Sequence, residues 1–201
     1  MFDVITILLV GALLIFAGYT ALHFVGRYPK RTVDDVAPFL RPAEAHELES
    51  LLDPGQETNC RLRVSTYEFA GWQRKRIHLM REYLLRMSHN ALVLIEWGNM
   101  EAFAEEGSNS ERSKQKQLLA QELVQAATEF RLYSLIALIK LKLWLLLPSG
   151  FFLAVHSPSL PRLRKVFGIS ALGSYERLRK AVGSLSLVYS HDLHQDLLAR
   201  L

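Results

Sequence analysis

Two histidines late in the sequence have the spacing that is most suggestive of a chemical function. His191 and His194 stand three residues apart, and Asp192 and Asp196 lie beside them. Residues three apart share one face of a helix, which is where the ligands of one metal ion must converge. A metal site needs three or four such ligands, and no complementary cluster stands elsewhere in the sequence. The pattern therefore favours a solvated polar helix face, and we predict no metal ion and no cofactor.

Other reactive side chains occur without the partners that their chemistry requires. His46-Glu47 resembles the start of the H-E-x-x-H zinc motif, but Ser50 occupies the place of its second histidine. Cys60 is the only cysteine, so it forms no internal disulfide, and the sequence suits a reducing compartment. The phosphate-binding, dinucleotide-binding and nucleophile-elbow motifs are absent. We therefore assign no catalytic residue, and a non-enzymatic role is favoured.

A basic segment is the strongest candidate for a binding surface. Between Trp72 and Arg81 the sequence has no acidic residue and four basic ones, Arg74, Lys75, Arg76 and Arg81. Each such charge contributes about 1 kcal/mol near an anionic membrane surface. An acidic protein or the phosphates of a nucleic acid would suit the same charges, and a solvated basic helix back fits equally well. We expect these four residues to contact lipid or a protein partner, with nucleic acid the least favoured.

The first segment of the sequence predicts where such contacts take place. Val4 to Val25 carry no formal charge, and basic residues follow at positions 27, 30 and 31. As a helix this run would be about 33 Å long, enough to cross a bilayer. It is too long for the core of a signal peptide and has no basic leader. We expect residues 1–26 to form a single transmembrane anchor, with the N-terminus outside and the following domain on the cytoplasmic side.

The rest of the chain has the composition of a globular domain, not of a disordered one. The whole sequence is 50% hydrophobic and 22% charged, with a net charge of +4. Residues 27–64 are predicted to be a connector with one short helix, in which prolines at 29, 38 and 42 act as a semi-rigid spacer between the domain and the bilayer. We interpret Pro54-Gly55 as a break and Cys60–Ser65 as an extended lead-in to the next helix.

Residues 65–201 are predicted to form a helical domain built on a hairpin. Ser65-x-x-Glu68 and Ser108-x-x-Glu111 have the form of capping boxes, and each precedes a long stretch with apolar residues at intervals of three and four. The predicted helices span about 66–106 and 109–147, with Gly107 ending the first. The apolar stripes run through Ile77, Met80, Leu84, Met87, Ala91, Leu94 and Gly98, and through Leu119, Leu123, Ala126, Phe130, Tyr133 and Ala137. Each helix can bury its stripe against the other.

The segment 132–155 is apolar nearly all round and admits three interpretations. Only Lys140 and Lys142 interrupt it, and Trp144 follows them. A buried core helix is favoured, ahead of a helix lying on the membrane surface with its lysines extended towards phosphates. A second membrane span is third, because two lysines in lipid would cost about 2.5–3.5 kcal/mol each. Lys140, Lys142 and Trp144 therefore join the candidate contacts with lipid or a partner.

The remaining residues, 158–201, contain more basic than acidic side chains. We expect them to form short helices, with Ser174 as a helix N-cap.

Taken together, the sequence predicts an all-α protein with one N-terminal transmembrane helix and a helical-hairpin bundle. The favoured function is a membrane-anchored interaction or scaffold protein that binds a protein partner or a second copy of itself. The alternative is a membrane-bound enzyme or lipid- or cofactor-binding protein with a site near 132–155.

Overall fold

The computed structural model describes residues 33–43, 45–104, 110–146, 165–166 and 169–201. The chain divides into two compact units, Met1–Lys30 and Arg31–Leu201, and all the described residues belong to the second. The predicted anchor over 1–26, the predicted helix stop at Gly107 and the end of the apolar segment (147–155) lie outside the described residues.

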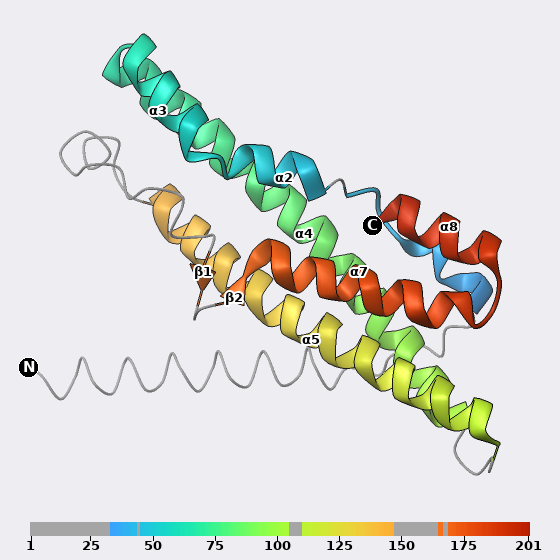
Figure 1. Ribbon diagram of the computed structural model, residues 1–201. Helices are drawn as coiled ribbons and strands as arrows, with labels where there is room; N and C mark the ends of the chain where they lie inside the picture. The colour runs from blue at the N-terminus through green and yellow to red at the C-terminus, as the bar shows by residue number, and fades with distance from the viewer. Residues whose placement is uncertain (1–32, 44, 105–109, 147–164, 167–168) are drawn as a thin grey trace, which may run out of the picture. The chain divides into compact units, whose positions relative to one another are not determined.

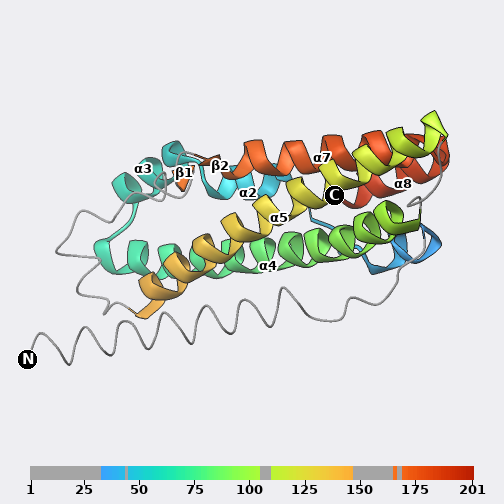
Figure 2. The ribbon, with the colours of Figure 1, turned by 90° about the horizontal axis from the view of Figure 1, so that it is seen from below.

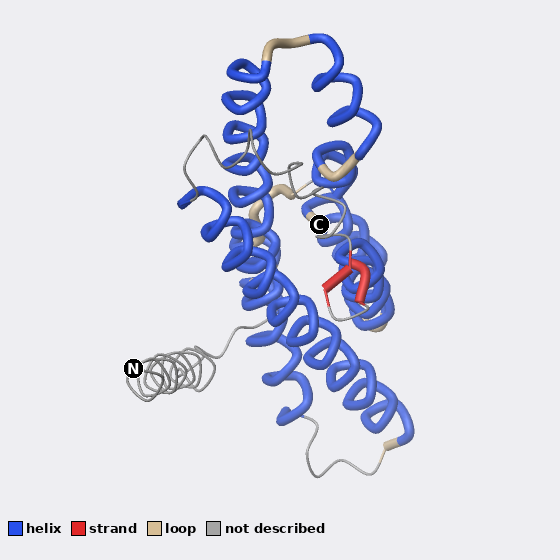
Figure 3. The backbone as a smooth tube through the Cα atoms, turned by 90° about the vertical axis from the view of Figure 1, so that its left-hand side faces the viewer, coloured by secondary structure: helices blue, strands red, loops and turns tan. Residues whose placement is uncertain are grey.

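The described residues are predominantly helical, as predicted, and pack as a bundle (Figures 1 and 3). The elements are η1 (Val33–Asp35), η2 (Ala37–Phe39), α2 (Ala45–Leu51), α3 (Pro54–Arg63), α4 (Thr66–Ala104), α5 (Glu111–Leu146), α7 (Ala171–Leu187) and α8 (His191–Arg200). A pair of two-residue strands, β1 (Lys165–Val166) and β2 (Ile169–Ser170), forms the one antiparallel β pairing within these ranges. Across the same ranges, no helix combines the length and the apolarity that crossing a bilayer requires.

Helices α4 and α5 form the antiparallel hairpin on which the rest of the bundle is built (Figures 1 and 2). The first capping box is present, since the Ser65 N–H donates to Glu68 Oε2 at 3.0 Å and the Glu68 N–H lies 3.4 Å from Ser65 Oγ. Every position of the predicted α4 stripe is buried. On α5 the stripe differs in part, because Ala120 and Ala127 are fully buried while Leu119 and Ala126 are half-buried.

The two long helices approach each other closely at Gly98. A Cβ atom placed there would lie 2.7 Å from Val124 Cγ2 and 3.1 Å from the Ala120 carbonyl oxygen. Both distances are shorter than normal van der Waals contact, so the close approach depends on glycine at this position. The register of the hairpin is therefore fixed by small residues, Gly98 and Ala120, at the crossing.

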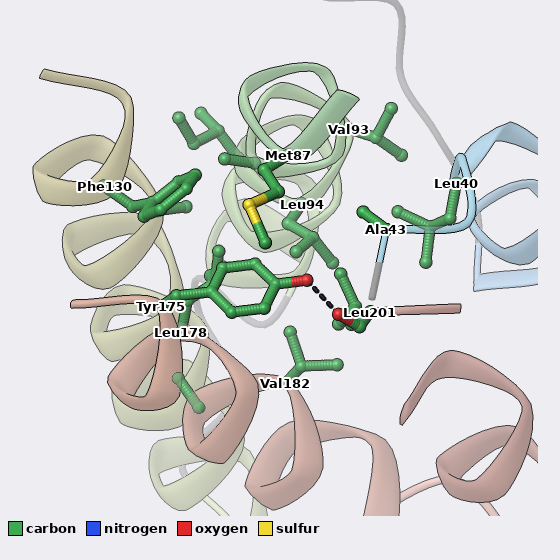
Figure 4. Close-up of a cluster of buried hydrophobic side chains, with 14 of the residues drawn as sticks. Leu40, Ala43, Met87, Val93, Leu94, Phe130, Tyr175, Leu178, Val182 and Leu201 are labelled. Carbon is green, nitrogen blue, oxygen red and sulfur yellow. Dashed lines mark hydrogen bonds between the residues drawn. The ribbon is translucent and has the colours of Figure 1, made fainter. Parts of the chain in front are cut away.

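The other helices bury the open side of the hairpin. Helix α7 packs on α5, and α8 turns back along α7. Phe130 of α5 and Tyr175 of α7 pack at a ring-centroid distance of 5.2 Å, and the Tyr175 hydroxyl donates to the backbone oxygen of Leu201 (Figure 4). Met87 and Leu94 of α4 lie against the same cluster. Ser174 lies inside α7, which begins at Ala171, so its predicted role as an N-cap is wrong.

The described part of the predicted connector packs on α4. Asn90, which is fully buried, accepts a hydrogen bond from the Arg41 N–H at 2.8 Å and donates to the Arg41 carbonyl at 2.7 Å. The expected break at Pro54-Gly55 is instead the start of α3: Asp53 Oδ1 accepts from the Gly55 N–H at 3.0 Å, and Pro54 is the first helical residue. Cys60–Arg63 form the last turn of α3, so the expected extended lead-in shrinks to Val64 and Ser65.

Candidate functional site

The four basic residues predicted on α4 separate into three exposed side chains and one buried side chain. Arg74, Lys75 and Arg81 are exposed, whereas Arg76 is only 2% exposed. Arg76 Nε donates to the Leu51 carbonyl at 2.6 Å, Nη2 donates to the Asp53 carbonyl at 3.0 Å, and Nη1 pairs with Glu57 Oε2 at 3.2 Å. Arg76 therefore departs from the expected lipid or partner contact, because its guanidinium is used inside the protein.

Arg76 attaches the α2–α3 segment to α4. Burial lowers the pKa of its guanidinium, and the charge of Glu57 opposes that effect. The guanidinium also lies 5.0 Å from the ring centroid of Trp72, within the range of a cation–π contact. Removing one partner of such a pair leaves an uncompensated charge in the interior, so this ion pair is a strong local constraint.

The attachment presents an exposed corner between α3 and α4 that the sequence did not predict. We define the corner surface as Arg61, Leu62, Arg63, Tyr67, Arg74 and Lys75. All six side chains are exposed, and Leu62 and Tyr67 retain 80% and 85% of their accessible surface. The prediction of an extended segment at Cys60–Ser65 does not include this corner. The sequence feature that indicates it is the capping signal Asp53-Pro54, because this signal predicts a helix that begins just before the corner.

The candidate residues of α5 lie at the same end of the hairpin as the start of α4, because the two helices are antiparallel (Figure 2). Lys142 is exposed, Lys140 is half-buried, and Trp144 is half-buried against the core cluster. Between them, Leu141 is fully buried. In the described part of 132–155, one face of helix α5 thus packs in the core, while Leu132 and Ile139 on α5 remain partly exposed at 54% and 37%.

A second polar cluster lies at the other end of the hairpin and is mostly buried. Glu101 accepts from Trp97 Nε1 at 3.0 Å and pairs with Lys116 Nζ at 2.8 Å. Lys116 in turn lies 4.5 Å from the ring centroid of Tyr189, in the turn between α7 and α8. Burial raises the pKa of Tyr189 to about 12. These contacts join α4, α5 and the α7–α8 turn and give the cluster a packing role.

The two histidines considered as metal ligands have other partners. His194 Nδ1 lies 3.1 Å from Ser186 Oγ and 3.2 Å from the Gly183 carbonyl oxygen, and His191 Nε2 lies 3.0 Å from Gln195 Nε2. Ser186 is fully buried and bonds the same Gly183 carbonyl, so its hydroxyl is not placed as a nucleophile. In the part of the chain that the structure describes, no group of three or more His, Cys, Asp and Glu residues is suited to hold a metal ion.

A shallow groove of about 560 Å³ lies between α7 and α8. It combines apolar side chains, Leu187 and Leu198, with the basic residues Arg179 and Lys180, and His194 also lines it. This volume falls within the range of small-molecule sites. The groove is remote in sequence from 132–155, where the sequence places a ligand site.

No protein-family model, curated protein or solved structure matches this chain.

Proposed function

We propose that this protein is a non-enzymatic helical interaction module held at the cytoplasmic face of a membrane by its N-terminal segment. The observation that carries the proposal is the charge pattern of that segment: Val4–Val25 carry no formal charge, and basic residues follow directly. Such a run favours insertion, and the position of the basic residues favours the cytoplasmic side for the rest of the chain.

The polar contacts of the described unit support a binding role over a catalytic one. The charged and histidine side chains that could take part in catalysis are paired within the protein: Arg76 with Glu57, Glu101 with Lys116, and His194 with Ser186. Exposed basic and apolar side chains gather instead at the corner surface. A surface of this kind suits recognition of a partner, which needs complementary shape and charge and no reacting group.

Membrane fractionation of the full chain tests the tether. We expect the protein to remain in the pellet after extraction with alkaline carbonate. Replacing Leu13 and Leu14 together by arginine should release it, because each charge at the centre of a span costs about 2.5–3.5 kcal/mol. The matched control replaces the same two residues by valine and should stay in the pellet. Release of the unaltered chain by carbonate contradicts the proposal.

The single cysteine reports the side of the membrane. Cys60 is half-buried in the last turn of α3. A membrane-impermeant maleimide should label it in inside-out vesicles, and in right-side-out vesicles only after detergent is added. The opposite pattern would place the helical unit outside.

A ligand-binding role is the second candidate, and the α7–α8 groove is the observation that favours it. Its basic and apolar lining suits a small anionic amphiphile. Native mass spectrometry of the purified full chain should then reveal a bound mass that is lost in Lys180→Ala. A spectrum without any adduct in both proteins removes this candidate.

A further inference from the structure

The corner surface concentrates exposed apolar side chains at one turn. Leu62 and Tyr67 are the two most exposed large hydrophobic side chains within the described ranges, at 80% and 85%, and Val64 between them is 36% exposed. Single exposed apolar residues are common on soluble surfaces and need no explanation. Here, however, two of them flank one turn, so their exposure is concentrated at a single place.

The corner is held in this conformation by specific bonds. The Ser65 N–H and hydroxyl both donate to the Glu68 carboxylate, which starts α4 at a fixed position. On the α3 side, Arg76 binds the Leu51 and Asp53 carbonyls and Glu57. The exposure of Leu62 and Tyr67 is therefore a property of the folded corner and does not result from a frayed helix end.

The charge around these apolar side chains is positive. Arg61 and Arg63 flank Leu62, while Arg74 lies seven residues after Tyr67 and so shares its face of α4, with Lys75 beside it. The one acidic side chain between Arg61 and Lys75, Glu68, accepts the hydrogen bonds of Ser65. The buried Arg76–Glu57 pair adds no net charge. The corner surface thus consists of exposed apolar side chains surrounded by basic side chains.

We propose that the corner surface docks onto an anionic bilayer, with Leu62 and Tyr67 entering the interface and the four basic residues contacting lipid phosphates. This combination fits a membrane interface, which offers negative charge and an apolar phase within a few ångströms of each other. Nucleic-acid phosphates would satisfy the charges but would leave Leu62 in water. The inference rests on the proposed function, because the N-terminal tether keeps the corner close to the bilayer.

The test places a fluorophore at the corner of the full chain. The background is Cys60→Ser, and an environment-sensitive NBD group is attached to Leu62→Cys or Tyr67→Cys, so that each variant retains the other apolar residue. The control is Leu118→Cys on α5, where the native leucine is 66% exposed. Proteins are reconstituted into vesicles of phosphatidylcholine with about 30% phosphatidylserine, or of phosphatidylcholine alone.

We expect a blue shift of NBD emission, and quenching by spin-labelled lipid, for both corner probes in the anionic vesicles. The Leu118→Cys probe should show neither effect. Replacing Arg61 and Arg63 together by glutamine should lower the docked-to-free ratio reported by the Tyr67→Cys probe about 30-fold, since each charge near the surface contributes about fivefold. Raising the salt concentration should weaken docking in the same direction.

Flotation of the same vesicles separates this inference from the proposed function. Protein that floats while both corner probes emit as in water retains the tether and overturns the docking of the corner. Protein that fails to float overturns both. An equal shift at Leu118→Cys, or an equal shift in neutral vesicles, would show that contact does not depend on the corner or on its charge, and would refute the inference as stated.

Discussion

The two ends of α4 use similar side chains in opposite ways. At the corner end, near Tyr67, basic and apolar side chains are exposed, and the buried Arg76–Glu57 pair attaches the preceding helix. At the crossing end, around Gly98 and Glu101, the charged pair Glu101–Lys116 is mostly buried between aromatic rings. Helices α4 and α5 and the α7–α8 turn meet at the crossing end, whereas α3 joins the corner end through the bonds of Arg76.

This difference separates buried side chains that stabilise the bundle from side chains that remain exposed on the same helix. The crossing end mostly buries the Glu101–Lys116 pair and brings the backbones of α4 and α5 into close contact, so a change there disturbs the whole bundle. At the corner end the outward side chains Tyr67, Arg74 and Lys75 are exposed, so they can change without disturbing the core. The exposed side chains of the corner are consequently available for the binding role that we propose.

The largest effect on the difference between the two ends of α4 is expected when the bonds of Arg76 to the α2–α3 segment are lost. In Arg76→Met, Glu57 loses its cationic partner in the interior, and we expect a loss of about 3 kcal/mol in the stability of the α3 attachment. Because few other contacts join α3 to α4, the loss should be local. Hydrogen exchange should show lower protection of amides in α3, with unchanged protection around Gly98.

The neighbouring basic residue provides the matched control. Lys75 is exposed, so Lys75→Met should change stability by less than about 0.5 kcal/mol. The double variant Arg76→Met with Glu57→Leu removes both charges and should recover part of the lost protection. A loss of protection throughout the bundle in Arg76→Met would mean that the two ends are not energetically separate.

A smaller effect is expected at the crossing end, where one methyl group tests the close approach of the helices. In Gly98→Ala the new Cβ would meet Val124 and the Ala120 carbonyl, and overpacking of this kind costs about 1–3 kcal/mol. For Gly71, in the corner half of the same helix, an added Cβ would meet no atom within 4 Å apart from its chain neighbours and the backbone of its own helix. Gly71→Ala should therefore stabilise α4 by up to about 1 kcal/mol, as alanine does in exposed helices.

Thermal unfolding of the full chain in detergent micelles measures both changes. The two substitutions are chemically identical and lie in one helix, so their opposite signs would follow from packing alone. If both variants were equally stable, the contact at Gly98 would not set the register of the hairpin.

Local signals explain which parts of the fold are predictable from the sequence. The hairpin helices follow from their three-four apolar spacing and the Ser65–Glu68 box, which depend only on neighbouring residues. The bonds of Arg76 to Leu51 and Asp53, and of Asn90 to Arg41, join residues far apart in the chain. Nothing in the spacing of these residues indicates such pairs, so the sequence pattern groups Arg76 with its exposed neighbours.

The corner surface escapes prediction for a related reason. Its exposure arises where two helices meet, and Pro54-Gly55 is as typical of a break in the chain as of the capped helix start that the structure has there. On α5, the burial of Ala120 in place of the predicted Leu119 has a similar origin. The close crossing at Gly98 favours the small Ala120 over Leu119 opposite it, which is information that the α5 sequence alone does not carry.

Alkaline pH is expected to have the smallest effect on the free energy of unfolding, through two tyrosines that lie outside the corner surface. Burial raises the pKa of Tyr133 and of Tyr189 to about 12, compared with about 10 for an unfolded chain. The folded state therefore retains these protons while the unfolded state loses them. The resulting contribution to stability is complete below about pH 10, falls as the pH rises, and is lost through about pH 12.

At about pH 11 the expected loss is at most about 1.4 kcal/mol for each tyrosine, reduced for Tyr189 because its ring is partly exposed. Tyr133→Phe should flatten the fall in unfolding midpoint between about pH 10 and 12, and the ultraviolet absorbance of tyrosinate should show delayed ionisation of the unaltered protein. Since only slopes are compared, any change in baseline stability caused by the substitution cancels. An unchanged slope would mean that the Tyr133 hydroxyl ionises in the folded bundle as readily as in the unfolded chain, and that the buried face of α5 admits water near Tyr133.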